Sequence, residues 1–329
     1  MKIKKLLSKR FIIGICILIV VIAGAIGYYE YAKYYPSTDD SYIKAYIVNI
    51  APQVYGRVDG VYVETNEWIK KGTLLFSIDP RPFELIVEQN EASLSWSKKE
   101  VQLAEQEIKV SQSLLRQAQA KFIFAEQTYK RMTKLNKDKI ITDQNEDKVV
   151  QELKVTADKL KSALLGLHEN EQRLKISEAS VLEAKAQLNQ AKLNVTYTKI
   201  YAPANGYVSD CYLAVGEYVN TGQQVFAFID TDLWWIQANF KETDLARIKQ
   251  GQTAEVTIDM YDRTIKGTVM SVSFGSGVTY SLLPPENATG NWVKVVQRFP
   301  VRILVKDSDK NYPLRVGSSV NVKIDTTTK

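Results

Sequence analysis

The chain of 329 residues has very few side chains suited to metal or nucleophilic chemistry, with one histidine and two cysteines. A structural zinc site usually takes four nitrogen or sulfur ligands, and Cys211 has no evident cysteine or histidine companion for one. The histidine, His168, stands on a predicted helix surface, where a solvated side chain is the usual outcome. GSG at 275–277 lacks the third glycine of a dinucleotide loop. We therefore predict no catalytic residue, no metal site, no cofactor and no enzyme activity.

An excess of one charge sign is also missing from most of the chain. Five of the 43 basic residues lie in the first ten positions, which leaves 38 basic against 37 acidic residues in the rest. Nucleic-acid binding needs clustered cations that displace counterions from phosphates. A balanced chain with one short basic tail excludes that function.

Charged residues are absent from residues 11–29, FIIGICILIVVIAGAIGYY. This run is close to the ~20 residues that a helix needs to cross a bilayer and longer than the ~7 to 15 apolar residues of a cleaved signal, so we expect a retained anchor. The basic residues before it predict a cytoplasmic N-terminus and an exported remainder. Five tyrosines between residues 28 and 35 stand at the exit, where aromatic rings favour the headgroup layer. Cys16 lies inside the run and Cys211 beyond the membrane, so no disulfide is expected.

An internal repeat flanks the middle of the chain. APQVYGRVDGVYVETNEWIKKGTLLFSID begins at residue 51, and APANGYVSDCYLAVGEYVNTGQQVFAFID begins at residue 202. Each copy predicts short strands that cannot bury a face alone, so the two copies are expected to pack together as a sandwich. The predicted turn glycines correspond, Gly56 and Gly72 in the first copy with Gly206 and Gly222 in the second.

Proline is absent from residues 83–195, and Gly166 is the one glycine there, which predicts long helices. Large side chains repeat every seven residues along each arm, accompanied by a second seam of smaller ones, as coiled-coil packing requires. The seam includes Leu115 and Phe122 in the first arm and Leu160 and Leu167 in the second. An antiparallel hairpin with arms of about 75 Å follows. A dimerisation coiled coil is the alternative, but a hairpin has already paired its own seams.

The turn of the hairpin is predicted near residues 136–143, where the heptads stop. Asp143 can cap the second helix, with Glu146 three residues later. Lysine and arginine side chains crowd this end. They could simply complement the dipole of the first helix, but we favour a docking tip.

After residue 230 the segments WWIQANF, AEVTID, TIKGTVMSVSF and WVKVVQRFPVRILV alternate in hydropathy between turn residues, which predicts a small antiparallel β-barrel with an exposed loop at 275–291. The fold class is therefore elongated α+β. The predicted division of the chain is a cytoplasmic tail at 1–10, a transmembrane anchor at 11–29, a linker and first strand at 30–46, the first sandwich half at 47–82, the hairpin at 83–195, the second half at 196–230, and the β-barrel with a C-terminal tail at 231–329.

Five features carry a family resemblance: TDDSYIKA at 38–45, the split repeat, the heptad hairpin, IQANFKETDLARIKQGQ at 236–252, and SLLPPENATGNWVKVVQRFPVRI at 281–303. With them the chain resembles the HlyD-type periplasmic adaptor, or membrane fusion, proteins, and most closely their EmrA-like multidrug efflux branch. The resemblance covers essentially the whole chain. It implies that the repeat is a split lipoyl- or biotinyl-like domain. Carrier domains modify a lysine in the turn that residues 83–195 occupy here, so no cofactor attachment is expected.

The resemblance also implies partners. Such an adaptor would link an inner-membrane, proton-driven EmrB-like transporter to a TolC-like outer-membrane channel, as a homo-oligomer anchored in the lipid bilayer through residues 11–29. In related adaptors an arginine, a leucine four residues later and a serine seven residues beyond that are implicated in channel docking. Arg131, Leu135 and Thr142 have this spacing, with threonine in place of serine. Two alternatives stay open: an adaptor of an ABC-type protein or peptide exporter, and a carrier subunit of a lipoyl or biotin enzyme.

Overall fold

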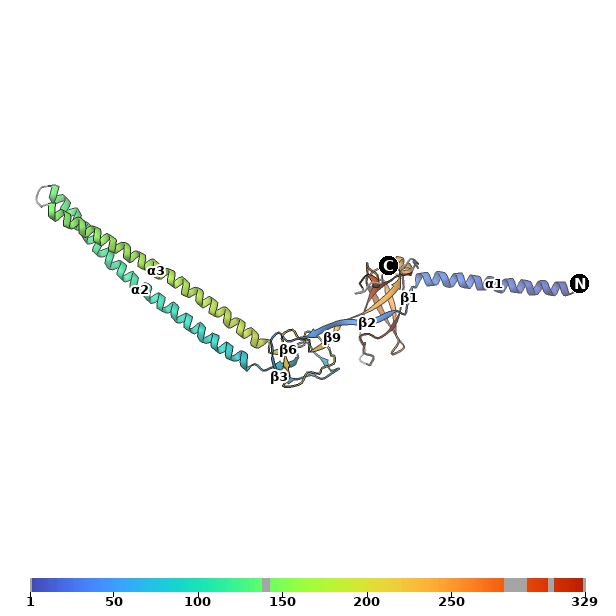
Figure 1. Cartoon of the computed structure of the whole chain (residues 1–329). Helices are drawn as coiled ribbons and strands as arrows, with labels where there is room; N and C mark the ends of the chain where they lie inside the picture. The colour runs from blue at the N-terminus through green and yellow to red at the C-terminus, as the bar shows by residue number, and fades with distance from the viewer. Residues whose placement is uncertain (1, 138–142, 281–294, 307–310, 328–329) are drawn as a thin grey trace, which may run out of the picture.

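The structure is a computed structural model that describes residues 2–137, 143–280, 295–306 and 311–327. The molecule is elongated (Figure 1), with a single helix at one end, a long helical hairpin at the other, and two β units between them. We call these the anchor-side β unit, whose core includes Ile43, Phe240 and Ile324, and the hairpin-side β unit, whose core includes Val58, Phe76 and Phe228.

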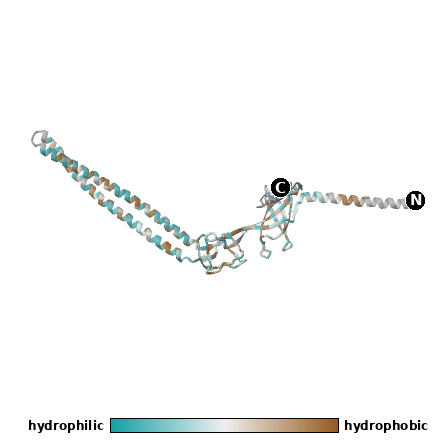
Figure 2. Ribbon diagram, in the orientation of Figure 1, coloured by the Kyte–Doolittle hydropathy of each residue, from teal (hydrophilic) through white to brown (hydrophobic). Residues whose placement is uncertain are grey.

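The single helix, α1, spans Lys2–Tyr34 and is about 50 Å long. It is longer at both ends than the predicted span 11–29. Within the described residues it is the one helix long and apolar enough to cross a membrane, over Ile17–Tyr34. The described apolar side chains Ile15 and residues 17–22 are exposed to the surroundings, and Figure 2 colours this stretch of α1 brown, as hydrophobic. A helix with exposed apolar side chains on all sides is typical of a membrane span.

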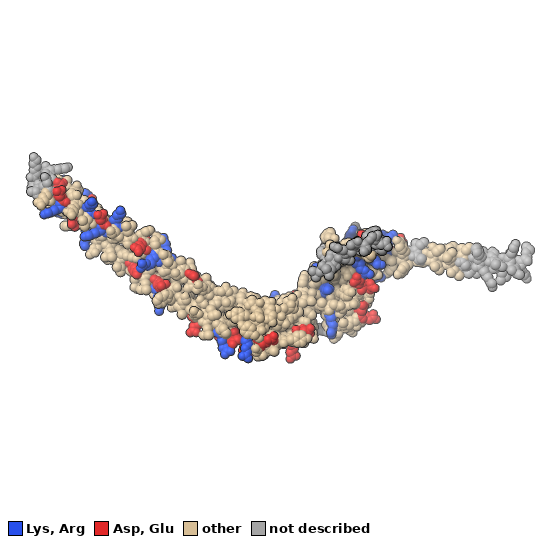
Figure 3. Space-filling model, viewed as in Figure 1, with Lys and Arg blue, Asp and Glu red and all other residues tan. Residues whose placement is uncertain are grey.

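The hairpin consists of α2, Arg81–Lys137, and α3, Asp143–Thr196, which run antiparallel side by side. Small buried side chains, among them Ala104 and Ala184, let the two helices approach closely. Three polar side-chain contacts between described residues join the helices, and we call them the cross-helix contacts. They are Asn170 Nδ2 to Ser111 Oγ at 2.5 Å, Arg173 Nη1 to Glu107 Oε2 at 3.4 Å, and Lys192 Nζ to Glu91 Oε1 at 2.9 Å. The exposed surface of the hairpin carries both charge signs along its length (Figure 3).

The hairpin-side β unit is built where the two repeat copies pair. Its short strands are β3 (Gly56–Val61), β4 (Trp68–Ile69) and β5 (Leu74–Ile78) from the first copy, β7 (Gly206–Val208) and β8 (Tyr218–Val219) from the second, and β6 (Lys199–Tyr201) directly before the second. The pairs β3–β8 and β4–β7 join one copy to the other, and β5–β6 joins the first copy to the segment that leads into the second. The rings of Phe76 and Phe226 pack edge to face across this junction, 6.1 Å apart. Neither copy could bury these side chains alone.

Two of the four turn glycines, Gly72 at φ 82° and Gly222 at φ 77°, have the left-handed conformation that favours glycine. The other two have no room for a Cβ. A Cβ at Gly206 would stand 2.0 Å from the carbonyl oxygen of Ile229, and one at Gly56 would stand 2.5 Å from Cγ2 of Ile78.

The anchor-side β unit has β1 (Ser37–Thr38), β2 (Ser41–Ile50), β9 (Phe226–Lys241), β10 (Thr253–Ile258), β11 (Arg263–Val272), β12 (Arg298–Val305) and β13 (Val320–Ile324), with short 3₁₀ helices η1 (Glu242–Arg247) and η2 (Gly277–Tyr280). Neighbouring strands follow the order β1-β13-β10-β11-β12-β9, and β2 also pairs with β9. All of these pairings are antiparallel. Alternate residues of each strand face one apolar core.

The two β units share two continuous strands, β2 and β9 (Figure 1). The boundary expected at residue 230 therefore falls inside the 16-residue strand β9. The register shifts there, because Ala45 pairs with Trp234 while the next residue, Tyr46, pairs with Asp230. Residues 231–233 form this bulge, which explains why the sequence at this point is typical of a turn.

Of the loop expected at 275–291, Gly277–Tyr280 forms η2 and residues 281–291 lie outside the described part.

Candidate functional site

The far end of the hairpin presents two of the three predicted docking residues. Arg131 is exposed, and Leu135, one helical turn further along α2, is 38% exposed. The Arg131 guanidinium donates from Nη2 to Thr128 Oγ1 at 3.4 Å, and among the described residues it has no carboxylate partner. A charged fork and an apolar side chain on adjacent turns can contact a partner together. Thr142 lies outside the described residues, as does the side chain of Asp143, at which α3 begins.

The four predicted seam residues, Leu115, Phe122, Leu160 and Leu167, are all half-buried. Neighbouring leucines point outward, since Leu114 is 55% and Leu165 is 58% exposed. Two isolated helices can cover their facing side chains only on the side toward the partner helix, so half-burial is expected at these positions.

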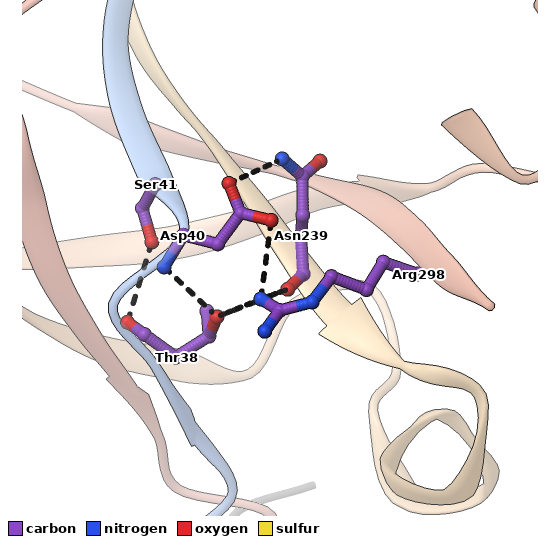
Figure 4. Close-up of polar contacts among 5 residues, drawn as sticks. All are labelled: Thr38, Asp40, Ser41, Asn239 and Arg298. Atoms are coloured by element: carbon purple, nitrogen blue, oxygen red, sulfur yellow. Dashed lines mark hydrogen bonds and ion pairs between the residues drawn. The ribbon is translucent and has the colours of Figure 1, made fainter. Parts of the chain in front are cut away.

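A polar network at the anchor-side end brings together three segments that are far apart in the sequence (Figure 4). Asp40 accepts from Asn239 Nδ2 at 3.0 Å and pairs with Arg298 Nη1 at 3.1 Å. Thr38 Oγ1 donates to the Asn239 carbonyl at 3.0 Å, and the hydroxyl of buried Ser41 donates to the Thr38 carbonyl at 3.3 Å. These bonds tie the start of β2 to the ends of β9 and β12, so the network positions the first strand after the anchor.

The network draws Thr38, Asp40 and Ser41 from the segment TDDSYIKA, Asn239 from IQANFKETDLARIKQGQ, and Arg298 from QRFPVRI. Sequence reasoning included Asp40 only as part of the segment TDDSYIKA and did not single out Asn239 or Arg298. Their membership of these segments was the available signal, but no spacing in the sequence shows that they meet.

A second cluster, which we call the exit clamp, holds the end of α1 against the anchor-side β unit. Lys323 Nζ donates to Tyr31 Oη at 2.7 Å and lies 5.1 Å from the ring centroids of both Tyr31 and Tyr35. Arg247 lies over the Tyr34 ring at 4.5 Å and donates to the Lys33 carbonyl at 3.4 Å. The hydrogen bond from Lys323 to Tyr31 raises the pKa of the Lys323 ammonium, which therefore stays charged. The clamp fixes the anchor helix to the β unit.

The side chains suited to chemistry do not converge. No group of three histidine, cysteine or acidic residues capable of holding a metal occurs in the described ranges. His168 is 68% exposed at its side chain, with Nδ1 3.7 Å from Glu171 Oε2 on the same helix. Cys211 is a free thiol. What the structure offers instead is a long apolar helix at one end, two β units joined by shared strands, and the end of a long hairpin at the other.

Comparison with known proteins gives this arrangement a family. The family model described as "RND MFP, barrel-sandwich hybrid domain" matches residues 46–231, more than half of the chain, and the "AAEA-like beta-barrel domain" matches residues 233–325. The chain is 30% identical to the multidrug export protein EmrA of Escherichia coli K12 over 93% of its own length and 81% of that protein's. It is 30% identical to the multidrug resistance protein MdtN of Escherichia coli O157:H7, over 88% of this chain and 89% of that one.

Two solved structures share the fold. The membrane fusion protein Spr0693 from Streptococcus pneumoniae R6 has a TM-score of 0.56 at 13% identity and covers 88% of this chain and 97% of its own. MacA from Actinobacillus actinomycetemcomitans has a TM-score of 0.54 at 20% identity and covers 88% and 79%. The expected family is confirmed. The chain belongs to the membrane fusion proteins, a family of non-catalytic adaptors.

Proposed function

We propose that this protein is the periplasmic adaptor of a tripartite multidrug efflux pump, which links an EmrB-like inner-membrane transporter to a TolC-like outer-membrane channel. In this proposal α1 crosses the inner membrane with a cytoplasmic N-terminus, the hairpin is a coiled coil, and the hairpin-side β unit is a split lipoyl-like sandwich without a modified lysine. The observation that carries the proposal is the hairpin, because α2 extends about 85 Å from the β units on the side away from α1. The names of the relatives support drug export over protein export.

The docking residues of this proposal are Arg131, Leu135 and Thr142. Arg131 and Leu135 are exposed where the hairpin ends, and a side chain without a carboxylate partner can donate to carbonyls or carboxylates of a channel. Thr142 keeps the hydroxyl of the family serine, which gives it the same hydrogen-bonding capacity.

The test is a photocrosslinker at position 135 in intact cells, with mass spectrometry of the product. We expect the parent chain to capture an outer-membrane channel protein. Arg131→Asp should capture it several-fold less and lower drug resistance while the protein level stays the same, because a surface charge reversal costs little stability but repels a matched surface. Arg116→Asp, the same reversal at an exposed position midway along α2, is the control. Equal capture and equal resistance in Arg131→Asp and the parent would remove Arg131 from docking.

The proposal includes a homo-oligomer, because one hairpin cannot enclose a conduit. Trp96, Leu103 and Val110 recur every seven residues on the outer face of α2 and are 66%, 60% and 61% exposed. On α3, Ile176 and Leu182 are 68% and 69% exposed. The cross-helix contacts show which residues of the two helices lie at the same height along the hairpin. Leu182 of α3 lies at a height between Trp96 and Leu103 of α2, and Ile176 lies at a height between Leu103 and Val110. Neighbouring hairpins side by side could therefore interleave these side chains.

Leu103→Glu should reduce the oligomer of the detergent-solubilised full chain in native mass spectrometry, because a charge would enter an apolar contact. Gln102→Glu, an added charge at the adjacent exposed position, should not. An unchanged oligomer in Leu103→Glu would argue against this face.

A further inference from the structure

The exit clamp fixes the depth at which part of the anchor-side β unit meets the membrane. The uncharged run ends at Tyr29, so residues 31–34 stand about 3 to 7 Å beyond it along α1. The headgroup layer on each side of a bilayer is about 5 to 7 Å thick. Lys323 is bonded to Tyr31, and Arg247 to the Lys33 carbonyl. With the uncharged run 11–29 crossing the bilayer core, as in the proposed anchor, both cations lie at the level of the lipid phosphates.

An open cleft of about 650 Å³ adjoins Lys323 at this exit. Three basic and three acidic side chains line it, namely Lys241, Arg298 and Lys323 with Asp39, Asp244 and Glu255. Glu255 is the cross-strand neighbour of Lys323, from β10 to β13. Ser37 and Thr38, the first residues after the turn that ends the anchor, also line the cleft. Opposite charges side by side in one cleft match a ligand that itself carries both signs.

We propose that this cleft binds the headgroup of an aminophospholipid of the outer leaflet, with the phosphate on Lys323 and the ammonium on Glu255 and its acidic neighbours. An ammonium donates three hydrogen bonds to carboxylates, whereas the trimethylated nitrogen of a choline headgroup has no proton to donate. The cleft therefore prefers the ethanolamine to the choline headgroup. An anionic headgroup would bring no cation for the three carboxylates. The inference rests on the proposed anchor, since it needs α1 in a bilayer.

The test uses the full chain in nanodiscs that contain equal amounts of phosphatidylethanolamine and phosphatidylcholine, with native mass spectrometry of the lipids that stay bound after release. We expect phosphatidylethanolamine to exceed phosphatidylcholine about tenfold on the parent chain, because charge-assisted hydrogen bonds separate the two. Lys323→Ala should lose the bound lipid. Glu255→Gln should keep a lipid but lose the preference. An excess of inorganic phosphate should displace neither lipid, because a free phosphate lacks the ammonium.

Two controls separate lipid binding from a merely structural clamp. Lys44→Ala removes the same charge from β2 at a position opposite Trp235, and it should behave as the parent. Tyr31→Phe removes the bond that holds Lys323 but leaves its charge, and it should keep the preference. Three outcomes would each overturn the proposal. The parent chain could show no preference for phosphatidylethanolamine, Lys323→Ala could keep that preference unchanged, or Tyr31→Phe and Lys323→Ala could lose bound lipid equally. If Lys323→Ala does not fold, Glu255→Gln decides it. A failure of the anchor itself is distinguishable, because the chain would then not enter nanodiscs.

Discussion

At the scale of single residues, Gly206 in the hairpin-side β unit leaves no room for a side chain. A Cβ there would meet the Ile229 carbonyl at 2.0 Å and the Phe228 ring at 2.8 Å, and a backbone atom cannot rotate away as a flexible side chain can. Gly206→Ala must therefore push β7 from β9, the strand that continues into the anchor-side β unit. Both the sheet and the core beneath it depend on this contact.

We expect Gly206→Ala to lower the free energy of unfolding by about 3 kcal/mol, measured by urea denaturation with the intrinsic fluorescence of the β units as signal. Gly166→Ala is the matched control. It adds the same methyl group inside α3, where no atom lies within 4 Å, and should stabilise the helix by about 0.5 to 1 kcal/mol. A Gly206→Ala protein as stable as the parent would show that β7 and β9 tolerate separation.

The start of α2 carries a titratable pair. The hydrogen bonds and charge of the Arg81 guanidinium lower the pKa of the Asp79 carboxyl from 3.8 to about 2, with Arg81 Nη2 2.6 Å from Asp79 Oδ2. Because the pKa of Asp79 is lowered in the folded state, its ionised carboxylate contributes to the free energy of unfolding. This contribution is complete above pH 3.8 and is lost as the pH falls toward 2. A carboxyl-detected NMR titration should give Asp79 a midpoint near 2, and Arg81→Ala should return it toward 3.8. A midpoint already near 3.8 in the parent contradicts the pairing.

At the scale of elements, the seven-residue pattern of the hairpin makes its seam and outer positions unequal. Leu167 is half-buried between the helices, whereas Leu164, less than one turn earlier, is 55% exposed. Leu167→Ala should lower the free energy of unfolding of the helices by about 2 kcal/mol in far-ultraviolet circular dichroism, because it removes contacts across the seam. Leu164→Ala should change it by less than about 0.5 kcal/mol. Equal effects of the two substitutions would mean that Leu167 does not face α3.

The elements differ in how far the sequence predicted them. The helices were expected over 83–195 and are found at Arg81–Lys137 and Asp143–Thr196, because a heptad pattern is local and repeats many times. The pairing of the two repeat copies was expected as well, since each copy alone is too small to bury Phe76 or Phe226. The segment WWIQANF was expected as a strand, but its continuity with residues 226–230 in the single strand β9 was not. Residues 230–232, DTD, are typical of a turn, and only the pairing with β2 shows that they lie at a bulge.

The exit clamp and the polar network could not be predicted. Lys323 and Tyr31 are 292 positions apart, and Arg298 and Asp40 are 258 apart. No periodicity relates residues at such separations, and one sequence carries no record of which pairs meet. The five tyrosines could be assigned to the membrane exit, but their cationic partners come from η1 and β13. Which residues come together in the exit clamp and the polar network is determined by tertiary contacts.

At the scale of the whole molecule, the distance between the two ends is the central feature. The hairpin lies at one end of the β units and α1 at the other (Figure 1), while the β units are joined by the shared strands β2 and β9. A protein that bridges two membranes depends on this length, whereas a protein that only dimerises through a coiled coil does not. The two interpretations therefore differ in what happens when the hairpin is made shorter.

The most direct measurement removes two heptads from each arm, residues 101–114 and 167–180, which the cross-helix contacts place at the same levels. The deletion shortens the hairpin by about 21 Å, keeps both seams in register, and leaves the tip and the anchor unchanged. Photocrosslinking from position 135 in intact cells is the readout. If the hairpin spans the distance to an outer-membrane channel, the shortened protein should stay in the inner membrane, fold and lose the channel crosslink. A shortened protein that still captures the channel as well as the parent would contradict the bridging role.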